Sequence, residues 1–135
     1  MKILVTGGAG YIGSHVVLDL LEADHDVIIL DDLSLGVELN IHSDAQFIFG
    51  STLDNEALKV CFRDQVDAVI HLAAFKAAGE SMTDPEKYSK NNISGTINLL
   101  NAMTDHGVHT FVFSSSAAVY GYPEYLPIDE DHPTD

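Results

Sequence analysis

The stretch ILVTGGAGYIG, residues 3–13, decides the fold of this chain. Its apolar start predicts a strand, and a helical pattern begins at Ile12. The turn between strand and helix contains Gly7, Gly10 and Gly13. In that context Gly7 would permit a tight turn, Gly10 would let the backbone approach a pyrophosphate, and Gly13 would let the helix pack closely on the strand. Unpaired amides at a helix start stabilise phosphate charge. We therefore expect a dinucleotide site here, the alternative being a tight turn without a ligand.

A carboxylate, Asp31, follows the second apolar run. This is about the distance beyond the glycines at which an acidic residue accepts hydrogen bonds from an adenosine ribose. Alternatively, Asp31 and Asp32 only begin a turn. After Lys2 the next lysine or arginine is Lys59, so no fixed cation is expected near the second strand to neutralise a ribose phosphate. The pattern predicts NAD as the cofactor and disfavours NADP.

Strand-like and helix-like segments alternate along the chain. We expect strands at residues 3–5, 27–30, 46–49, 68–72 and 110–113, and helices at residues 12–21, 56–62 and 88–103. Apolar strands separated by helices are typical of a doubly wound parallel sheet, a Rossmann fold of the α/β class, with strand order 3-2-1-4-5. Residues 32–44 read as a loop with one helical turn, and residues 121–135 as a loop that leaves the fold incomplete at the C-terminus.

Length and composition limit the class of protein. The 135 residues, 46% of them hydrophobic, predict one domain over residues 1–135, and the glycine loop makes it an NAD-binding domain. The first apolar run is broken too early for a signal peptide and no stretch reaches the length of a membrane span, so we expect a cytoplasmic protein without membrane contact. Cys61 is expected to pack as a small hydrophobe. His106 and His109 have helical spacing, but nothing completes a ligand set, and no metal site is expected.

The charge balance is strongly acidic, with 21 Asp and Glu against 6 Lys and Arg and a formal net charge of -15. Nucleic acid is not an expected partner, because its binding needs clustered cations. Two explanations of the acidic surface stay open. One is adaptation to a salty cytoplasm, where screening removes repulsion between carboxylates; the other gives the surface no special meaning.

Four blocks of sequence carry a resemblance to a known family. They are GGAGYIGSH (residues 7–15), HLAAFKAAGES (residues 71–81), NNISGT (residues 91–96) and FSSSAAVYG (residues 113–121). On these blocks the chain resembles the N-terminal portion of the extended short-chain dehydrogenase/reductase superfamily and, within it, the UDP-glucose 4-epimerases. The glycine block is shared across the superfamily, whereas the lysine and serine blocks point to the epimerases.

The resemblance implies a cofactor cleft at the carboxyl ends of the strands. Together with the glycine loop, it implies these cofactor-binding residues: Gly7, Gly10, Tyr11, Ile12, Gly13, Asp31, Ser51, Ala73, Ala74, Phe75, Lys76, Asn91 and Ser114. Lys76 would offset pyrophosphate charge, and Asn91 would lie near cofactor and substrate. A solvated lysine and an ordinary helix residue are the alternatives. Relatives often carry an aspartate beside the adenine where this chain has Ser51, which weakens the expectation of adenine recognition there.

Ser116 is the catalytic candidate, because it matches the active-site serine or threonine that hydrogen-bonds the reacting hydroxyl of the sugar in this family. Three serines directly after a buried strand would also place hydroxyls at the carboxyl edge of the sheet, facing the glycine loop. The alternative is a serine-rich cap for the turn that follows.

The resemblance implies NAD-dependent interconversion of UDP-glucose and UDP-galactose by hydride abstraction and return at sugar C4, with a homodimer as a common assembly. The family's base is the tyrosine of a Tyr-x-x-x-Lys motif, which does not occur in these 135 residues, so we expect them alone to bind NAD weakly and not to turn over. An epimerase for another UDP-sugar and a non-catalytic NAD-sensing module stay open. A sugar-nucleotide 4,6-dehydratase is disfavoured, because Ala117 and Ala118 stand where its acid and base are expected.

Overall fold

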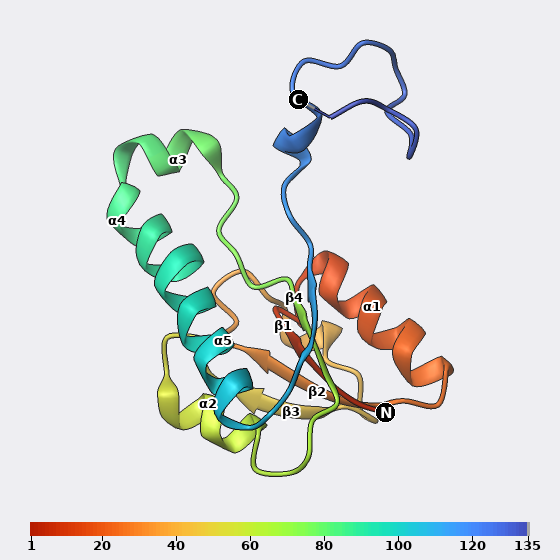
Figure 1. Cartoon of the computed structure of the whole chain (residues 1–135), viewed down its shortest axis with the longest axis vertical. Coiled ribbons are helices and arrows are strands. Elements are labelled where there is room, and N and C mark those ends of the chain that lie inside the picture. Colours follow the sequence, from red (N-terminus) through yellow and green to blue (C-terminus); the bar gives the residue numbers. More distant parts are fainter. Residues whose placement is uncertain (135) are drawn as a thin grey trace.

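The computed structural model describes residues 1–134 and contains a five-stranded sheet in which all neighbouring strands are parallel. The strands are β1 (Lys2–Thr6), β2 (Asp26–Asp31), β3 (Gln46–Phe49), β4 (Ala68–His71) and β5 (Thr110–Phe113). Their order in the sheet is β3-β2-β1-β4-β5 (Figure 1). This confirms the predicted Rossmann fold, its strand order and the positions of all five strands to within two residues.

Helices cover both faces of the sheet (Figure 1). They are α1 (Tyr11–Glu22), α2 (Asn55–Cys61), α3 (Ala78–Thr83), α4 (Pro85–Tyr88) and α5 (Gly95–Asp105). The expected helical turn in the loop after β2 is a 3-10 turn at Glu38–Asn40, and a second 3-10 turn spans Ala117–Tyr120. Among residues 1–134 no helix is long and apolar enough to cross a membrane.

The sheet separates two hydrophobic cores, because side chains alternate between its faces along each strand. In β1, Leu4 packs with Leu58 of α2 and Leu99 of α5. Its neighbours on either side, such as Val5, pack on the opposite face with Val17 of α1. All five side chains are at most 2% exposed, and burying each one stabilises the fold by about 1.5–3 kcal/mol.

The helical region after β4 differs from the prediction. We expected one helix over residues 88–103, whereas the structure begins α4 at Pro85 and inserts a π-helical segment, Ser89–Ser94, before α5. The early start is explained by Asp84, which accepts a hydrogen bond from the Lys87 amide as the N-cap, and by Pro85 at the first helical turn. The short helix α3 was also not predicted. It lies away from the sheet and so lacks the one-sided apolar pattern on which the prediction relied (Figure 1).

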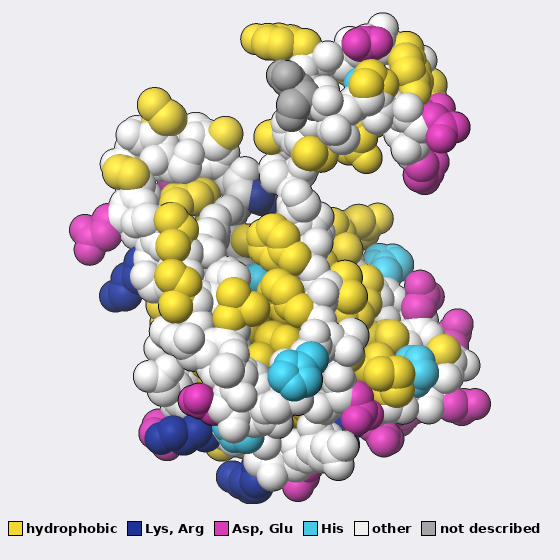
Figure 2. Space-filling model, viewed as in Figure 1, with side chains coloured by type: hydrophobic (Ala, Val, Ile, Leu, Met, Phe, Trp, Pro, Cys, Tyr) yellow, Lys and Arg dark blue, Asp and Glu magenta, His cyan; other side chains and the backbone are white. Residues whose placement is uncertain are grey.

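The strand β5 forms one edge of the sheet and is the least covered of the five. Val112 and Phe113 are 51% and 60% exposed. Figure 2 shows hydrophobic side chains gathered over the middle of this face of the molecule, with acidic side chains around its periphery. The chain after β5 runs away from the sheet (Figure 1), so it does not cover this edge.

Candidate functional site

The segments singled out by the sequence meet at the carboxyl edge of the sheet. Strand register makes Leu30, Thr6, His71 and Phe113 neighbours in one row across β2, β1, β4 and β5. The residues that follow them along the chain are Asp31, Gly7, Leu72 and Ser114. The glycine loop, the acidic residue, the lysine block and the serine block therefore leave the sheet side by side (Figure 1). Open parallel sheets bind ligands at this edge.

The glycine loop begins with a close approach between two backbones. Gly7 has φ +75, and a Cβ placed on it would lie 2.8 Å from the Leu72 carbonyl carbon and from the Ala73 nitrogen. Its amide also donates to the Leu30 carbonyl at 2.9 Å. Any side chain at this position would separate the glycine loop from the segment after β4. The predicted tight turn at Gly7 is present.

Gly13 has a different neighbour from the one we expected. The prediction placed it against the strand, but a Cβ there would strike the Gly7 carbonyl oxygen and the Gly8 Cα, which belong to the turn. The absence of a side chain thus lets the first turn of α1 fold back on the glycine loop. Gly10 is the N-cap of α1, and no side chain satisfies the first amides of the helix. Tyr11, at 80% exposed, and Ile12, at 55%, lie at this opening.

Asp31 points toward the glycine loop. The residue is 7% exposed; Oδ2 accepts a hydrogen bond from the Ala9 amide at 3.0 Å, and Oδ1 accepts one from the Leu33 amide at 2.8 Å. Asp31 therefore begins a turn, as the alternative held, and at the same time contacts the glycine loop. Each carboxylate oxygen has further lone pairs for a ligand.

The loop after β2 is held against the glycine loop by residues that the sequence analysis did not single out. The Val37 amide and the Asn40 side-chain amide both donate to the Ala9 carbonyl, at 3.0 and 3.1 Å. Gly36 lies over Asp31, since a Cβ there would come within 2.7 Å of Oδ1. Nothing in the sequence distinguishes Asn40 from the other polar residues of this loop.

The lysine block lies beside the glycine loop, and Asn92 fixes its backbone. Asn92 Oδ1 accepts from the Phe75 amide at 3.0 Å, and Asn92 Nδ2 donates to the Phe75 carbonyl at 2.8 Å. Asn91, the predicted residue, instead donates to Asn92 Oδ1 at 3.0 Å and so supports it. The sequence offered two adjacent asparagines and no signal to separate their roles. Ala73 is half-buried and Lys76 is exposed, with no carboxylate of residues 1–134 within ion-pairing distance of the lysine.

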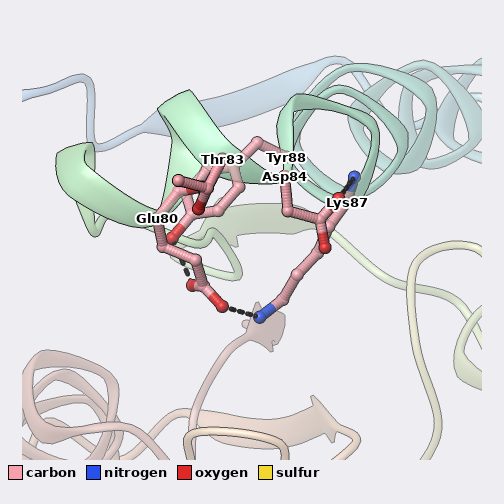
Figure 3. A network of polar contacts seen from close by, with 5 residues as sticks. All are labelled: Glu80, Thr83, Asp84, Lys87 and Tyr88. Carbon is pink, nitrogen blue, oxygen red and sulfur yellow. Dashed lines mark hydrogen bonds and ion pairs between the residues drawn. The ribbon is translucent and has the colours of Figure 1, made fainter.

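A polar network joins α3 to α4 next to this block (Figure 3). Glu80 accepts from the Lys87 ammonium at 2.7 Å and from the Tyr88 hydroxyl at 2.6 Å. The Lys87 ammonium also lies 4.5 Å from the centre of the Phe75 ring. The hydrogen bond from Lys87, followed by that from Tyr88, lowers the pKa of the Glu80 carboxyl. The network links the two short helices to the segment that Asn92 holds.

The serine block leaves β5 exposed at the same edge. Ser116 Oγ accepts a hydrogen bond from the Ala118 amide at 3.2 Å and so caps the 3-10 turn, as the alternative held. Its own hydroxyl proton is free to be donated. Ser114 is exposed, and Ser115 has a positive φ of 58°. After β3, Ser51 is half-buried and its Oγ accepts from the Leu53 amide at 3.2 Å.

A surface hollow of about 510 Å³ lies at the opposite end of the strands. It is lined by residues at the starts of β1, β2 and β3, among them Lys2, Asp26 and Gln46. It presents no glycine turn and no helix start. We place the candidate site at the carboxyl edge, because the backbone amides and carboxylate that suit a phosphate and a ribose gather there.

Comparison with known proteins agrees with this geometry. The family model described as NAD dependent epimerase/dehydratase matches residues 3–135. This chain belongs to that family. It is 47% identical over 135 residues to a UDP-glucose 4-epimerase of Streptomyces lividans, covering 98% of this chain and 41% of the relative. It is also 47% identical over 148 residues to a UDP-glucose 4-epimerase of Mus musculus, covering 98% of this chain and 42% of that one.

Solved structures of the epimerase/dehydratase family have the same fold. One described as UDP-glucose 4-epimerase superposes with a TM-score of 0.89 at 39% identity, covering 100% of this chain and 41% of that chain. Another, from Bifidobacterium longum in complex with NAD+ and UDP, gives a TM-score of 0.86 at 37% identity, with 100% and 43% covered. The chain thus spans about 41% of the length of the curated relatives it matches, and the resemblance stated from the sequence is confirmed.

Proposed function

We propose that this chain is the NAD-binding domain of an enzyme that interconverts UDP-glucose and UDP-galactose at sugar C4. The observation that carries the proposal is the glycine loop at the start of α1, braced by the Asp31 carboxylate through the Ala9 amide at 3.0 Å. Relatives that bear the name UDP-glucose 4-epimerase support the activity. Neighbouring structures in complex with NAD, from Brucella ovis and Thermus thermophilus, support the cofactor.

The residues at the carboxyl edge fit a dinucleotide. The first amides of α1 have no side-chain cap, so they are available to a pyrophosphate. Asp31 has lone pairs that can accept two ribose hydroxyls, and the exposed Lys76 can offset phosphate charge. When bound, NAD would supply a reversible hydride acceptor.

Ser116 is our candidate for contact with the sugar. Its Oγ already accepts from the Ala118 amide, so the orientation of the side chain is set before substrate arrives. The hydroxyl proton is then directed away from the amide and can be donated to the oxygen at sugar C4. A hydrogen bond to that oxygen helps to hold C4 in line for hydride transfer, and Ser116 thus orients the reacting carbon without changing its own protonation.

The proposed substrate class is a nucleotide sugar. The identity of the sugar is inferred only from the names of the relatives. Most of those above are described as UDP-glucose 4-epimerases. One neighbouring structure from Campylobacter jejuni is described as a UDP-Glc/GlcNAc 4-epimerase. We therefore propose UDP-glucose and UDP-galactose as the main pair, with an acetamido sugar as a second substrate to be assayed beside them.

A homodimer is part of the proposal. The helix α5 carries Ile97 and Leu100, 51% and 40% exposed, and Ile93 just before it is 60% exposed. Figure 2 shows hydrophobic side chains along this side of the molecule. An Ile97→Glu change is expected to shift the mass in light scattering from dimer to monomer, whereas a wild-type monomer at micromolar concentration would contradict the assembly.

The activity is tested on the longest polypeptide that the gene encodes. UDP-galactose and catalytic NAD should yield UDP-glucose without net reduction of the cofactor. Ser116→Ala should lower kcat by about 100-fold, and Ser116→Thr, which keeps a hydroxyl, should recover most of it. No conversion by the wild type with any UDP-sugar, despite saturable NAD binding, would favour a binding module over an enzyme.

A further inference from the structure

A buried histidine at the end of β4 has no role in the site described so far. His71 is 4% exposed and lies between two threonine hydroxyls. Its Nδ1 is 2.6 Å from Thr6 Oγ1, at the end of β1, and its Nε2 is 2.9 Å from Thr96 Oγ1, on α5. The ring also stacks with Phe111 and Phe113 at centroid distances of 6.1 and 6.0 Å. Both ring nitrogens are therefore engaged.

The directions of these hydrogen bonds follow from counting protons. Thr96 Oγ1 donates its only proton to the Asn92 carbonyl at 2.7 Å. It can only accept from His71, so Nε2 carries the imidazole proton. Nδ1 is then a bare lone pair, and the Thr6 hydroxyl donates to it. Burial lowers the pKa of His71, which keeps the ring in this neutral state.

The chain of bonds joins two loops of the candidate site. Thr6 directly precedes the glycine loop, and at the other end Asn92 holds both the amide and the carbonyl of Phe75 in the lysine block. The three hydrogen bonds depend on one another in the order Thr96 to the Asn92 backbone, His71 to Thr96, and Thr6 to His71. No buried side-chain nitrogen or oxygen among residues 1–134 lacks a hydrogen-bond partner. The buried polar atoms of this network therefore have their partners without a ligand.

We propose that His71 is a positioning residue, which as the neutral Nε2–H tautomer holds the glycine loop and the Phe75 segment in register before the cofactor binds. The inference rests on the proposed function for its consequence, tighter binding of NAD. NAD would bind only to molecules in which both loops are in place. If only a fraction of the molecules has both loops ordered, the apparent Kd equals the intrinsic Kd divided by that fraction, so binding is weaker.

The central variant is Thr96→Val, which removes the hydroxyl but keeps the shape of the side chain. We expect the Phe75 amide to exchange with solvent about tenfold faster, and NAD to bind about tenfold more weakly. Thr96→Ser should restore both. Thr104→Val is the matched control, because Thr104 makes the same bond to the carbonyl four residues earlier in α5, at 2.9 Å, without touching His71. It should change neither readout.

The wild-type protein gives a second, independent measurement. Nitrogen-15 spectra of the imidazole should show a proton on Nε2 and a bare Nδ1 at neutral pH, and burial should keep the ring neutral below the ordinary pKa of histidine. A proton on Nδ1 would overturn the inference, as would a Thr96→Val protein that melts earlier yet keeps its Phe75 exchange rate and NAD affinity. If the wild type bound no NAD, the proposed function would fail, while the tautomer and the Phe75 exchange would still decide whether His71 orders these loops.

Discussion

Asp31 Oδ2 accepts a hydrogen bond from the Ala9 amide at 3.0 Å, across 22 positions of the sequence. This bond joins the end of β2 to the glycine loop at the start of α1. The carboxylate that we assign to the ribose therefore also shapes the loop that we assign to the pyrophosphate. A change at Asp31 should alter both parts of the site together.

Replacing Asp31 with Asn tests this double role. The variant keeps the size of the side chain but loses the negative charge of the carboxylate, which accepts from the buried Ala9 amide and the partly buried Leu33 amide. Hydrogen bonds to charged groups contribute about 1.5–3 kcal/mol, so we expect NAD to bind at least about tenfold more weakly and the protein to melt earlier. Calorimetric titration and thermal unfolding measure the two effects. Asp32→Asn is the control, since Asp32 Oδ1 accepts only from the Ser34 amide in an exposed turn; an equal loss in both variants would contradict the account.

Gly13→Ala tests the contact between α1 and the glycine loop. The new methyl would strike the Gly7 carbonyl oxygen, which is backbone and cannot rotate away. We expect the free energy of unfolding to fall by about 1–3 kcal/mol in denaturant titrations. Gly79→Ala in α3 meets nothing within 4 Å, and it should be neutral or stabilising by up to about 1 kcal/mol. A Gly13→Ala protein as stable as the wild type would contradict the close contact between α1 and the Gly7 carbonyl.

The network of Glu80, Lys87 and Tyr88 predicts a pH dependence for α3 and α4. The hydrogen bond from Lys87, and then that from Tyr88, lowers the pKa of Glu80 in the folded protein. The network therefore contributes stability above the unfolded pKa of a glutamate, and this contribution is lost as the pH falls through the lower, folded value. Amide exchange in α3 should accelerate in that acidic range and, at neutral pH, in Glu80→Gln. Glu86→Gln, on the neighbouring helix α4 and outside the network, should leave the amide exchange of α3 unchanged. Identical amide exchange in Glu80→Gln and the wild type would contradict the role of this network in stabilising α3.

The acidic surface predicts a response to salt. With a formal net charge of -15, repulsion between carboxylates destabilises the folded state, and only three lysine–carboxylate ion pairs are present among residues 1–134. If the surface is adapted to a salty cytoplasm, the melting temperature should rise steadily with potassium chloride up to molar concentrations. A melting temperature that stays flat or falls would leave the acidic surface without that explanation.

Much of the fold could be predicted from the sequence, because buried strands and the glycine turn have local signals. The alternation of apolar strands with helices gave the sheet order, and Gly7 sits in the tight turn that its position implied. Long-range hydrogen bonds have no such signal. The role of Asn92 rather than Asn91 at Phe75, and the contact of Gly13 with the turn rather than the strand, depend on how distant segments come together. The π-helical segment before α5, which contains Asn92, was also missed.

The most direct test of the central claim is a pair of titrations, with NAD and with NADP, on the longest polypeptide that the gene encodes. We predict saturable binding of NAD and binding of NADP weaker by roughly 100-fold, because a ribose phosphate would meet the Asp31 carboxylate in a part of the chain, residues 3–58, that carries no lysine or arginine. Equal affinity for the two, or no binding of either, would contradict the assignment of the glycine loop and Asp31 to NAD.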